Sequence, residues 1–454
     1  MSSDFYIFIN NIYALLTISA RGDIITLVLY YKAIFKQSFR KIQDMKKFLT
    51  DRRKSLYLFL LLFISYSLIY MTKNCYSAAM ASIVAKGIMT KSQTGLIAAL
   101  FYLLYAPFQI VGGVAADKYS PAKLILYGTF GAGLCNALVY VFSESYVAML
   151  IIWSLNAVIQ FGIWPSIFKI VVSQLAPEHR TRGIFFILLT PSAGLALSYA
   201  SAVFITNWRF NFLLSAIILF AIVPIFFFIY RNIEKSMTVE NDALKKEAKT
   251  EKIQGAALVR KIIISGIPIL LIIYVVQGLL SIGIKSLVPV MLMESYDLTP
   301  SLANGLNVIL VLTGPLGTLL GALPLFKKFS YPTTITILFG LSLPAVFIIT
   351  YIGNISAAAI IVALIAVTVF MAATSVYFSQ TSRVFEKFGF GGTLSGLYNC
   401  MSAIGLVLSN YVFTSVAEDF GWGVTTNTWL ILLSLALVLL CITIPIWKRF
   451  IKSL

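Results

Sequence analysis

Three lysines interrupt long apolar stretches of this 454-residue chain, and they are the residues most able to do chemistry there. Lys73, Lys169 and Lys285 each lie within a run long enough to cross a bilayer, whereas all 17 acidic residues lie outside such runs. A charged side chain in hydrocarbon costs about 2.5–3.5 kcal/mol on insertion scales and usually has a function. Because no carboxylate within a span can neutralise these lysines, we expect an anionic substrate to supply the missing counter-charge.

The composition is that of an integral membrane protein. Hydrophobic residues make up 59% of the chain and charged residues only 11%. Continuous apolar runs of about 20 residues cross about 30 Å of hydrocarbon as helices, and they lack the alternation of barrel strands. The sequence therefore predicts an all-α fold of twelve transmembrane helices. The expected spans are 55–82, 92–115, 121–142, 146–173, 183–206, 210–230, 261–290, 300–325, 332–352, 355–381, 392–416 and 424–447.

The net charge of +18 first suggests a nucleic-acid partner, but its distribution indicates membrane topology instead. Of the 35 lysines and arginines, 29 lie in the termini and in alternate loops that would face one side, and only Lys86, Lys91 and Arg209 face the other. Cytoplasmic loops carry such an excess of basic residues. We therefore expect a multi-pass protein of the cytoplasmic membrane with both termini in the cytoplasm, the lipid bilayer as a partner, and no nucleic-acid partner.

The sequence predicts no cofactor, no metal and no enzymatic activity. Its four cysteines (Cys75, Cys135, Cys400 and Cys441) lie within spans far apart along the chain, and the only histidine, His179, lies in a loop. This pattern has neither metal-ligand spacing nor a set of nucleophile and base.

A polar segment divides the predicted spans into two sets of six. Residues 232–260 are rich in lysine and glutamate, so we interpret them as a cytoplasmic linker between a first half, 55–231, and a second half, 261–454. Residues 1–54 would form a cytoplasmic N-terminal segment. Within it, residues 1–44 are interpreted either as a translation-start extension or as an interfacial helix or an extra span.

Short echoes about 210 residues apart support a duplication of the two halves. Ser192 in the fifth span matches Ser402 in the eleventh, and Trp208 and Trp422 open the sixth and twelfth spans. Parallel repeats of this kind place the binding site at the interface between the halves.

The same repeat relates two of the lysines. Lys73 and Lys285 are 212 residues apart, on the first span of each half, and would face each other at similar depth across one cavity. The alternatives are coincidence and, for Lys73, snorkelling to the outer interface. For Lys169, which lies near the cytoplasmic end of its span, snorkelling is the better interpretation.

Between the second and third predicted spans lies the run Gly113 to Lys118, followed by Lys123. With this run, the chain from about residue 52 onward resembles the major facilitator superfamily. Further motifs are Lys73-Asn74, Tyr105, Trp164-Pro165, Lys169, Arg182-Gly183-Ile184, Pro289 and the run Asp419 to Trp422. On these residues the chain resembles, within that superfamily, the organophosphate:phosphate antiporter family, which includes glycerol-3-phosphate transporters.

The chain departs from that family at the positions that bind phosphate. The resemblance implies a pair of arginines, one from the first span of each half, but these positions hold Thr72 and Ser281. The family's supporting lysine and cavity histidine fall at Gln109 and Ser192. An arginine fork binds phosphate at two points, whereas lysine offers a point charge. The family's tight organophosphate site is therefore not expected here.

Two cations nevertheless lie close to the replaced positions. Lys73 directly follows Thr72, and Lys285 lies one helical turn after Ser281 on the same face. Such a cavity would suit a carboxylate, a sugar acid or a differently placed phosphate. Uncharged donors that would complete it, or would instead bind one helix to another, are Asn74, Gln109, Gln160, Gln277, Asn307, Tyr377, Gln380 and Asn399.

The resemblance implies alternating access, in which the halves rock around a central site. Asp117 and Lys118, next to Gly113, would close the cytoplasmic side together with Arg182. No acidic residue or histidine lies within a span, so we expect anion exchange rather than proton symport, although a desolvated lysine could itself carry a proton. Close approach of helices is expected at Gly112, Gly113, Gly194 and Gly405.

The expected function is therefore secondary transport of a small organic anion by a monomer. The alternatives are a transporter-like sensor, since the resembling family includes sugar-phosphate receptors, a proton-coupled solute carrier, and a multidrug exporter. The exporter is disfavoured because binding cationic drugs usually needs an acidic residue within the spans.

Overall fold

The computed structural model describes residues 46–49, 52–175, 177–240, 256–352, 357–385, 388 and 390–454. Contacts divide the chain into two compact units, residues 1–47 with 238–245, and residues 48–237 with 246–454. In the first unit, strands β1 (Lys46–Phe48) and β2 (Thr238–Glu240) pair in a two-stranded sheet. Residues 1–45 of the predicted N-terminal segment and 241–255 of the predicted linker lie outside the described residues.

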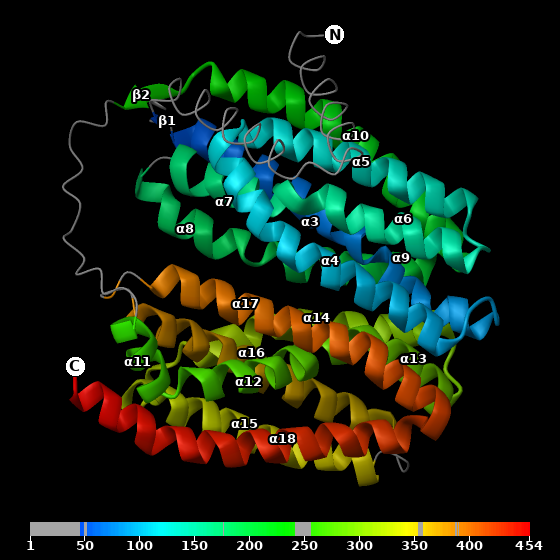
Figure 1. Cartoon of the computed structure of the whole chain (residues 1–454). Helices are drawn as coiled ribbons and strands as arrows, with labels where there is room; N and C mark the ends of the chain where they lie inside the picture. Colours follow the sequence, from blue (N-terminus) through cyan, green and yellow to red (C-terminus); the bar gives the residue numbers. More distant parts are fainter. Residues whose placement is uncertain are drawn as a thin grey trace, which may run out of the picture. The chain divides into compact units, whose positions relative to one another are not determined.

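The second unit begins with helices that follow the first six predicted spans in order (Figure 1). These are α3 (Arg52–Ala85), α4 (Lys91–Lys118), α5 (Pro121–Val141), α6 (Tyr146–Ile159), the 3-10 turn η1 (Gln160–Gly162), α7 (Ile163–Gln174), α8 (Pro177–Ile187), α9 (Thr190–Phe204) and α10 (Trp208–Glu234). The predicted fifth and seventh spans need correction, because neither is one continuous helix. A turn separates α8 from α9, since Pro191 favours the first turn of a new helix.

The second six spans follow in the same unit. They are formed by α11 (Ala256–Ile264), α12 (Ile267–Gly278), the π-helical segment η2 (Leu279–Gly283), α13 (Ile284–Tyr296), α14 (Pro300–Gly321), η3 (Pro324–Lys328), α15 (Tyr331–Phe347), η4 (Ile348–Ile352), α16 (Ala357–Val384), α17 (Gly391–Leu408), η7 (Ser409–Phe413) and α18 (Thr414–Lys452). Gly266, with φ 79°, separates α11 from α12, and Gly421, with φ 82°, interrupts α18. Both angles lie in the left-handed region that glycine adopts at least cost.

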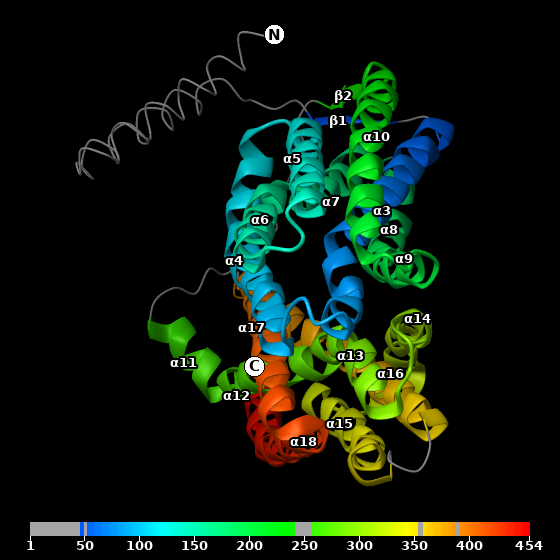
Figure 2. The same cartoon turned by 90° about the vertical axis from the view of Figure 1, so that its right-hand side faces the viewer.

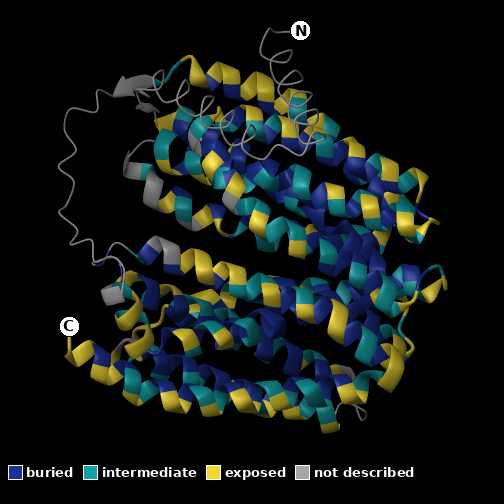
Figure 3. Ribbon diagram, in the orientation of Figure 1, coloured by how far each residue is buried: buried dark blue, intermediate teal, exposed yellow. Residues whose placement is uncertain are grey.

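The membrane-spanning fold predicted from the sequence is confirmed. Nine segments of the described chain are long and apolar enough to cross a bilayer, and the last of them, Leu394–Lys452, holds the final two predicted spans. Figure 2 shows the helices of this unit closer to end-on, α3 to α10 in one group and α12 to α18 in another. Apolar side chains such as Phe204 and Val362 are exposed, which suits a surface that faces lipid. Figure 3 shows exposed residues along the helices of this unit.

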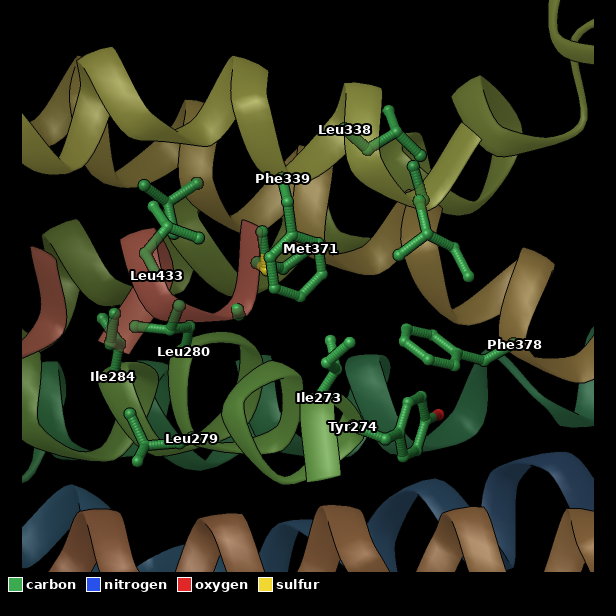
Figure 4. Packing of buried hydrophobic residues seen from close by; sticks show 14 of the residues in the cluster. Ile273, Tyr274, Leu279, Leu280, Ile284, Leu338, Phe339, Met371, Phe378 and Leu433 are labelled. Carbon is green, nitrogen blue, oxygen red and sulfur yellow. The ribbon is translucent and has the colours of Figure 1, made fainter. Parts of the chain in front are cut away.

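Each half of this unit has its own hydrophobic core. In the second half, Leu280, Ile284, Phe339, Met371 and Leu433 belong to one cluster, formed by η2, α13, α15, α16 and α18 (Figure 4). A separate cluster fills the first half, from α3, α5, α7 and α10. Two further clusters join the halves. One includes residues of α3, α4, α6 and α10 together with Val290 of α13, and a smaller one includes Ala78, Tyr199 and Val311. Separate cores allow each half to keep its packing if the contacts between them change.

Three of the four predicted close helix approaches are confirmed. A Cβ atom at Gly112 would overlap the carbonyl oxygen of Phe161, and one at Gly194 would overlap that of Ser67. At Gly405 it would overlap the carbonyl oxygen of Val275, so α12 and α17 touch there through their backbones. The expectation is wrong for Gly113, where a Cβ would meet nothing within 4 Å.

Replacing Gly405 by leucine should separate α12 from α17 and destabilise the protein. Overpacking of a well-packed site costs typically about 1–3 kcal/mol, and backbone atoms of Val275 cannot rotate away as a side chain could. We expect a lower unfolding temperature in detergent and less monodisperse protein. The matched control is Gly340→Leu in α15, where a Cβ meets nothing within 4 Å. Equal unfolding temperatures for the two variants would contradict this packing contact.

Candidate functional site

Lys73 lies in α3, where three tyrosine rings surround its ammonium group. Its Nζ is 3.8 Å from the ring centroid of Tyr105, 4.6 Å from that of Tyr70 and 6.0 Å from that of Tyr102. We call these three residues the tyrosine box. Only 6% of the lysine is exposed. A cation–π contact contributes about 0.5–1 kcal/mol at an exposed site and about 2 kcal/mol or more when the cation is desolvated, so the three rings together offset part of the cost of burying the charge.

Helical spacing and one amide build the tyrosine box. Tyr70 lies three residues before Lys73 on α3, and Tyr102 and Tyr105 lie three residues apart on α4, so each pair shares a helix face. The Tyr102 hydroxyl donates to Oδ1 of Asn74 at 3.1 Å, and Nδ2 of Asn74 donates to the carbonyl of Tyr70 at 2.8 Å. The amide of Asn74 thus joins Tyr70 to Tyr102, and its expected contact with substrate stays a prediction.

Lys285 lies at the start of α13, and a proline determines its backbone environment. Pro289 has no N–H, so the Lys285 carbonyl has no donor four residues later in its own helix. Two side chains from other helices replace that donor. The Tyr199 hydroxyl of α9 donates at 3.0 Å, and Nδ2 of Asn307 of α14 donates at 2.7 Å. This carbonyl therefore joins the first half to the second.

The ammonium of Lys285 points to α14. A Cβ atom built at Gly314 would lie 3.5 Å from its Nζ and within 4 Å of no other atom. The lysine is half-buried. Lys91–Glu294 and Arg209–Glu144 are ion pairs between described residues, and in the described part of the chain no carboxylate pairs with Lys73 or Lys285. The two lysines thus lie against the second helix of their own half, and the predicted shared cavity stays a prediction.

Several other predicted ligand groups bind helices to each other or to themselves. Thr72 donates its hydroxyl to the carbonyl of Ile69 at 2.8 Å, within α3. Gln109 donates to the carbonyl of Phe161 at 3.3 Å, which joins α4 to η1. Tyr377 donates to the carbonyl of Gly321 at 2.7 Å, which joins α16 to α14. These bonds agree with the alternative interpretation of such residues as contacts between helices.

The remaining predicted ligand residues differ in their surroundings. Gln277 donates to the carbonyl of Met371 at 3.2 Å and to Oγ of Ser375 at 2.8 Å, while its buried Oε1 has no partner among the described residues. Ser281 is buried in the π-helical segment η2. Asn399 is exposed on α17.

The third lysine and the predicted gate lie at the opposite end of α4 from its N-terminus. Nζ of Lys169 donates to the carbonyl of Ala116 in the last turn of α4 at 2.7 Å, so the structure shows a bond to a helix end where we expected snorkelling. The side chain of Asp117 lies outside the described residues. Lys118 is half-buried, Arg182 is exposed, and their gating role, with that of Gly113, stays a prediction.

The sequence analysis missed a cluster of contacts between the halves at the N-terminus of α4. Lys91 pairs with Glu294 of α13 at 3.0 Å, and the backbone N–H of Ser92 donates to Oε2 of Glu418 in α18 at 2.6 Å. We call these four residues the α4 latch. A carboxylate at a helix N-terminus satisfies an unpaired N–H and complements the helix dipole. The sequence places both glutamates next to the ends of predicted spans, but it does not indicate that both contact the N-terminus of α4.

Two further contacts reinforce the α4 latch. The hydroxyls of Ser92 and Ser415 are 3.1 Å apart, and the indole N–H of Trp422 donates to Glu294 at 2.7 Å. A Cβ at Gly95 would overlap Thr414 and the carbonyl oxygen of Asn410, so α4 touches η7 and α18 closely here. The halves are held together at this end by charge and by backbone contact.

Comparison of the sequence with known families gives one match over most of the chain, the Major Facilitator Superfamily over residues 62–410. Curated relatives match over short stretches. A membrane sensor protein, UhpC, of Salmonella typhimurium strain LT2 is 36% identical over 102 residues, 22% of this chain and 23% of the relative. A probable hexose phosphate transport protein of Chlamydia pneumoniae is 28% identical over 123 residues, 27% of each chain. The matched stretches thus span about a quarter of these relatives' length.

Solved structures share the fold at low sequence identity. A bacterial homolog of the human lysosomal transporter Spinster, in an inward-facing and unoccupied conformation, has a TM-score of 0.67 and 13% identity, covering 89% of this chain and 98% of that one. The nucleoside transporter NupG has a TM-score of 0.65 and 12% identity, covering 86% of this chain and 99% of that one.

A double-mutant cycle tests whether the tyrosine box stabilises the charge of Lys73. Tyr105→Leu should lower the free energy of unfolding by more in the natural protein than in a Lys73→Met background, because only the first contains a cation for the ring to contact. We expect a coupling of about 1–2 kcal/mol, measured by thermal unfolding in detergent. Strictly additive effects would show that Tyr105 acts by packing alone.

Proposed function

The chain belongs to the Major Facilitator Superfamily, and from this premise we propose that it transports a small organic anion, in the first place a hexose phosphate, by alternating access. The observation that carries the proposal is the pair of lysines on α3 and α13, in corresponding helices of the two halves. In the described part of the chain neither has a carboxylate partner. A multi-pass membrane protein of a transport superfamily with such a pair is suited to an anionic substrate.

The charges favour exchange of anions over proton symport. Two lysines without a counter-charge in a closed site are unfavourable, and a bound anion relieves that cost. The loaded carrier would then change state quickly and the empty carrier slowly. The choice of a hexose phosphate is supported by the hexose phosphate transport protein of Chlamydia pneumoniae. Sugar acids and carboxylates are the alternatives, since a lysine binds any of these anions as a point charge.

Alternating access gives the α4 latch a role. We propose that both termini are cytoplasmic, from the distribution of basic residues, which puts the α4 latch on the outer side. The Lys91–Glu294 pair and the bond from Ser92 to Glu418 would then close the outer side in the present conformation and break when that side opens.

The second candidate function is a membrane sensor that binds the anion without carrying it. It is favoured by the 36% identity with the UhpC sensor over 102 residues. A sensor and a carrier can share the lysine site. They differ in turnover, because only a carrier moves substrate through a sealed vesicle.

Exchange in proteoliposomes tests the carrier function. Vesicles loaded with glucose 6-phosphate or inorganic phosphate should take up labelled glucose 6-phosphate rapidly, and vesicles loaded with glucose should not. Lys73→Gln and Lys285→Gln should each lower the exchange rate about tenfold or more, because each removes a positive charge that no described carboxylate neutralises, and one lost charge-assisted contact to an anion costs about 1.5–3 kcal/mol where the lysine contacts it directly. Lys86→Gln, in the turn between α3 and α4, is the matched control and should exchange normally.

The other outcomes are also informative. Binding of glucose 6-phosphate without any vesicle uptake would support the sensor. Uptake driven by a proton gradient alone, with no dependence on internal anion, would contradict exchange. Transport of neutral sugars or cations that is indifferent to both lysine substitutions would remove the basis of the proposal.

A disulfide across the α4 latch tests alternating access. The hydroxyls of Ser92 and Ser415 are 3.1 Å apart, so Ser92→Cys with Ser415→Cys should form a disulfide when the exposed Cys400 and Cys441 are replaced by serine. The oxidised protein should lose exchange, and reduction should restore it. Each single cysteine variant serves as a control that oxidation leaves active. Undiminished exchange by fully cross-linked protein would show that these contacts need not open.

A further inference from the structure

We propose that Lys285, rather than Lys73, contacts the anionic group of the substrate, and that Gly314 permits this contact because it places no side chain against the ammonium. The inference rests on the proposed function and names the part of the site that performs it. The observation behind it is a difference between corresponding positions of the two halves, Tyr105 on α4 and Gly314 on α14.

The second helices of the two halves begin in the same way. α4 starts after the N-cap Thr90 and α14 after the N-cap Thr299, and in each the threonine side chain accepts a hydrogen bond from the backbone N–H three residues later. Tyr105 is the fifteenth residue after the first cap, and Gly314 is the fifteenth after the second. Counted from the caps, the two residues hold corresponding places.

The lysines support this correspondence in space. Tyr105 has the ring nearest to the Lys73 ammonium, at 3.8 Å, and Gly314 is the residue whose Cβ would lie 3.5 Å from the Lys285 ammonium. One lysine therefore meets an aromatic ring where the other meets a glycine. The half with the ring supplies a surrogate for a counter-charge, and the half with the glycine does not.

The residue of α14 next to the Lys285 ammonium carries no side chain at all. A Cβ at Gly314 would meet the lysine Nζ and no other atom within 4 Å. By contrast, a Cβ at Gly317, one turn further along α14, would overlap the carbonyl oxygen of Val369. Gly317 is thus explained by helix packing and Gly314 is not, so the absence of a side chain at Gly314 serves the ammonium.

The backbone of Lys285 is fixed although its ammonium has no partner among the described residues. Tyr199 and Asn307 both donate to its carbonyl, at 3.0 and 2.7 Å. These two are positioning residues, because they hold α13 so that the lysine side chain extends toward Gly314. A cation on a fixed backbone next to a glycine is prepared for an anion, since little ordering is left to occur on binding.

Substitutions that add a side chain at Gly314 test the inference. Gly314→Tyr would give Lys285 an aromatic neighbour and should raise the Kd for glucose 6-phosphate at least about tenfold, measured by radioligand binding to purified protein. Gly314→Ala places a Cβ at ordinary contact distance, so it should fold normally and raise the Kd by a smaller factor. Gly340→Tyr, at a helix position where a Cβ meets nothing within 4 Å, is the matched control and should bind as the natural protein does.

The lysines provide the second measurement. Lys285→Gln should raise the Kd at least about tenfold, whereas Lys73→Gln should change it less than about threefold while still slowing exchange. The inference is overturned if Gly314→Tyr and Lys285→Gln bind glucose 6-phosphate normally, or if Lys73→Gln has the larger effect. If the natural protein binds neither glucose 6-phosphate nor inorganic phosphate, the proposed function itself fails, which is a different result from either of these.

Discussion

A lysine ammonium placed in hydrocarbon must be stabilised by something, and the second unit of this protein is organised around two such groups. In the first half the stabilising groups are the three rings of the tyrosine box, with Asn74 holding Tyr102 in place. In the second half the corresponding place holds Gly314, and in the described structure the ammonium of Lys285 has no aromatic ring or carboxylate beside it. One charge is therefore stabilised by aromatic rings of the fold, and in our proposal the other is stabilised by an anionic ligand.

Proline and glycine set the helix geometry on which this depends. Pro289 leaves the Lys285 carbonyl without a helical donor, and Tyr199 from the first half takes it up. Gly194 and Gly405 let backbones touch within each half. The two glycines thus allow close packing within each half. The Lys285 carbonyl, which Pro289 leaves without a helical donor, links one half to the other close to a charged side chain. A change in the contacts between the halves would therefore change the surroundings of Lys285.

The contacts between halves are of two kinds. Small apolar side chains such as Ala78 and Val311 pack near the level of Tyr199, and charged contacts close the end at the α4 N-terminus. Each half also has its own core. Opening this end would break the ion pair between Lys91 and Glu294 and the packing of Val290 against the first half, while each half could keep its own core. A sensor and a carrier would both use such an opening, and they would differ in whether the ligand leaves on the other side.

The sequence alone determined the membrane class, the twelve spans and the unusual lysines, because apolar length and charge are local properties that hydrocarbon enforces on every segment. It also predicted the close approaches at Gly112, Gly194 and Gly405, but not the break of the fifth span at Pro191. What surrounds each lysine was decided only by tertiary structure. Tyr105 and Gly314 have ordinary neighbours in the sequence, and only the packing of α4 on α3 and of α14 on α13 brings them to the ammonium groups. The α4 latch was hidden for the same reason, since Lys91, Glu294 and Glu418 lie far apart along the chain and meet only when the halves come together.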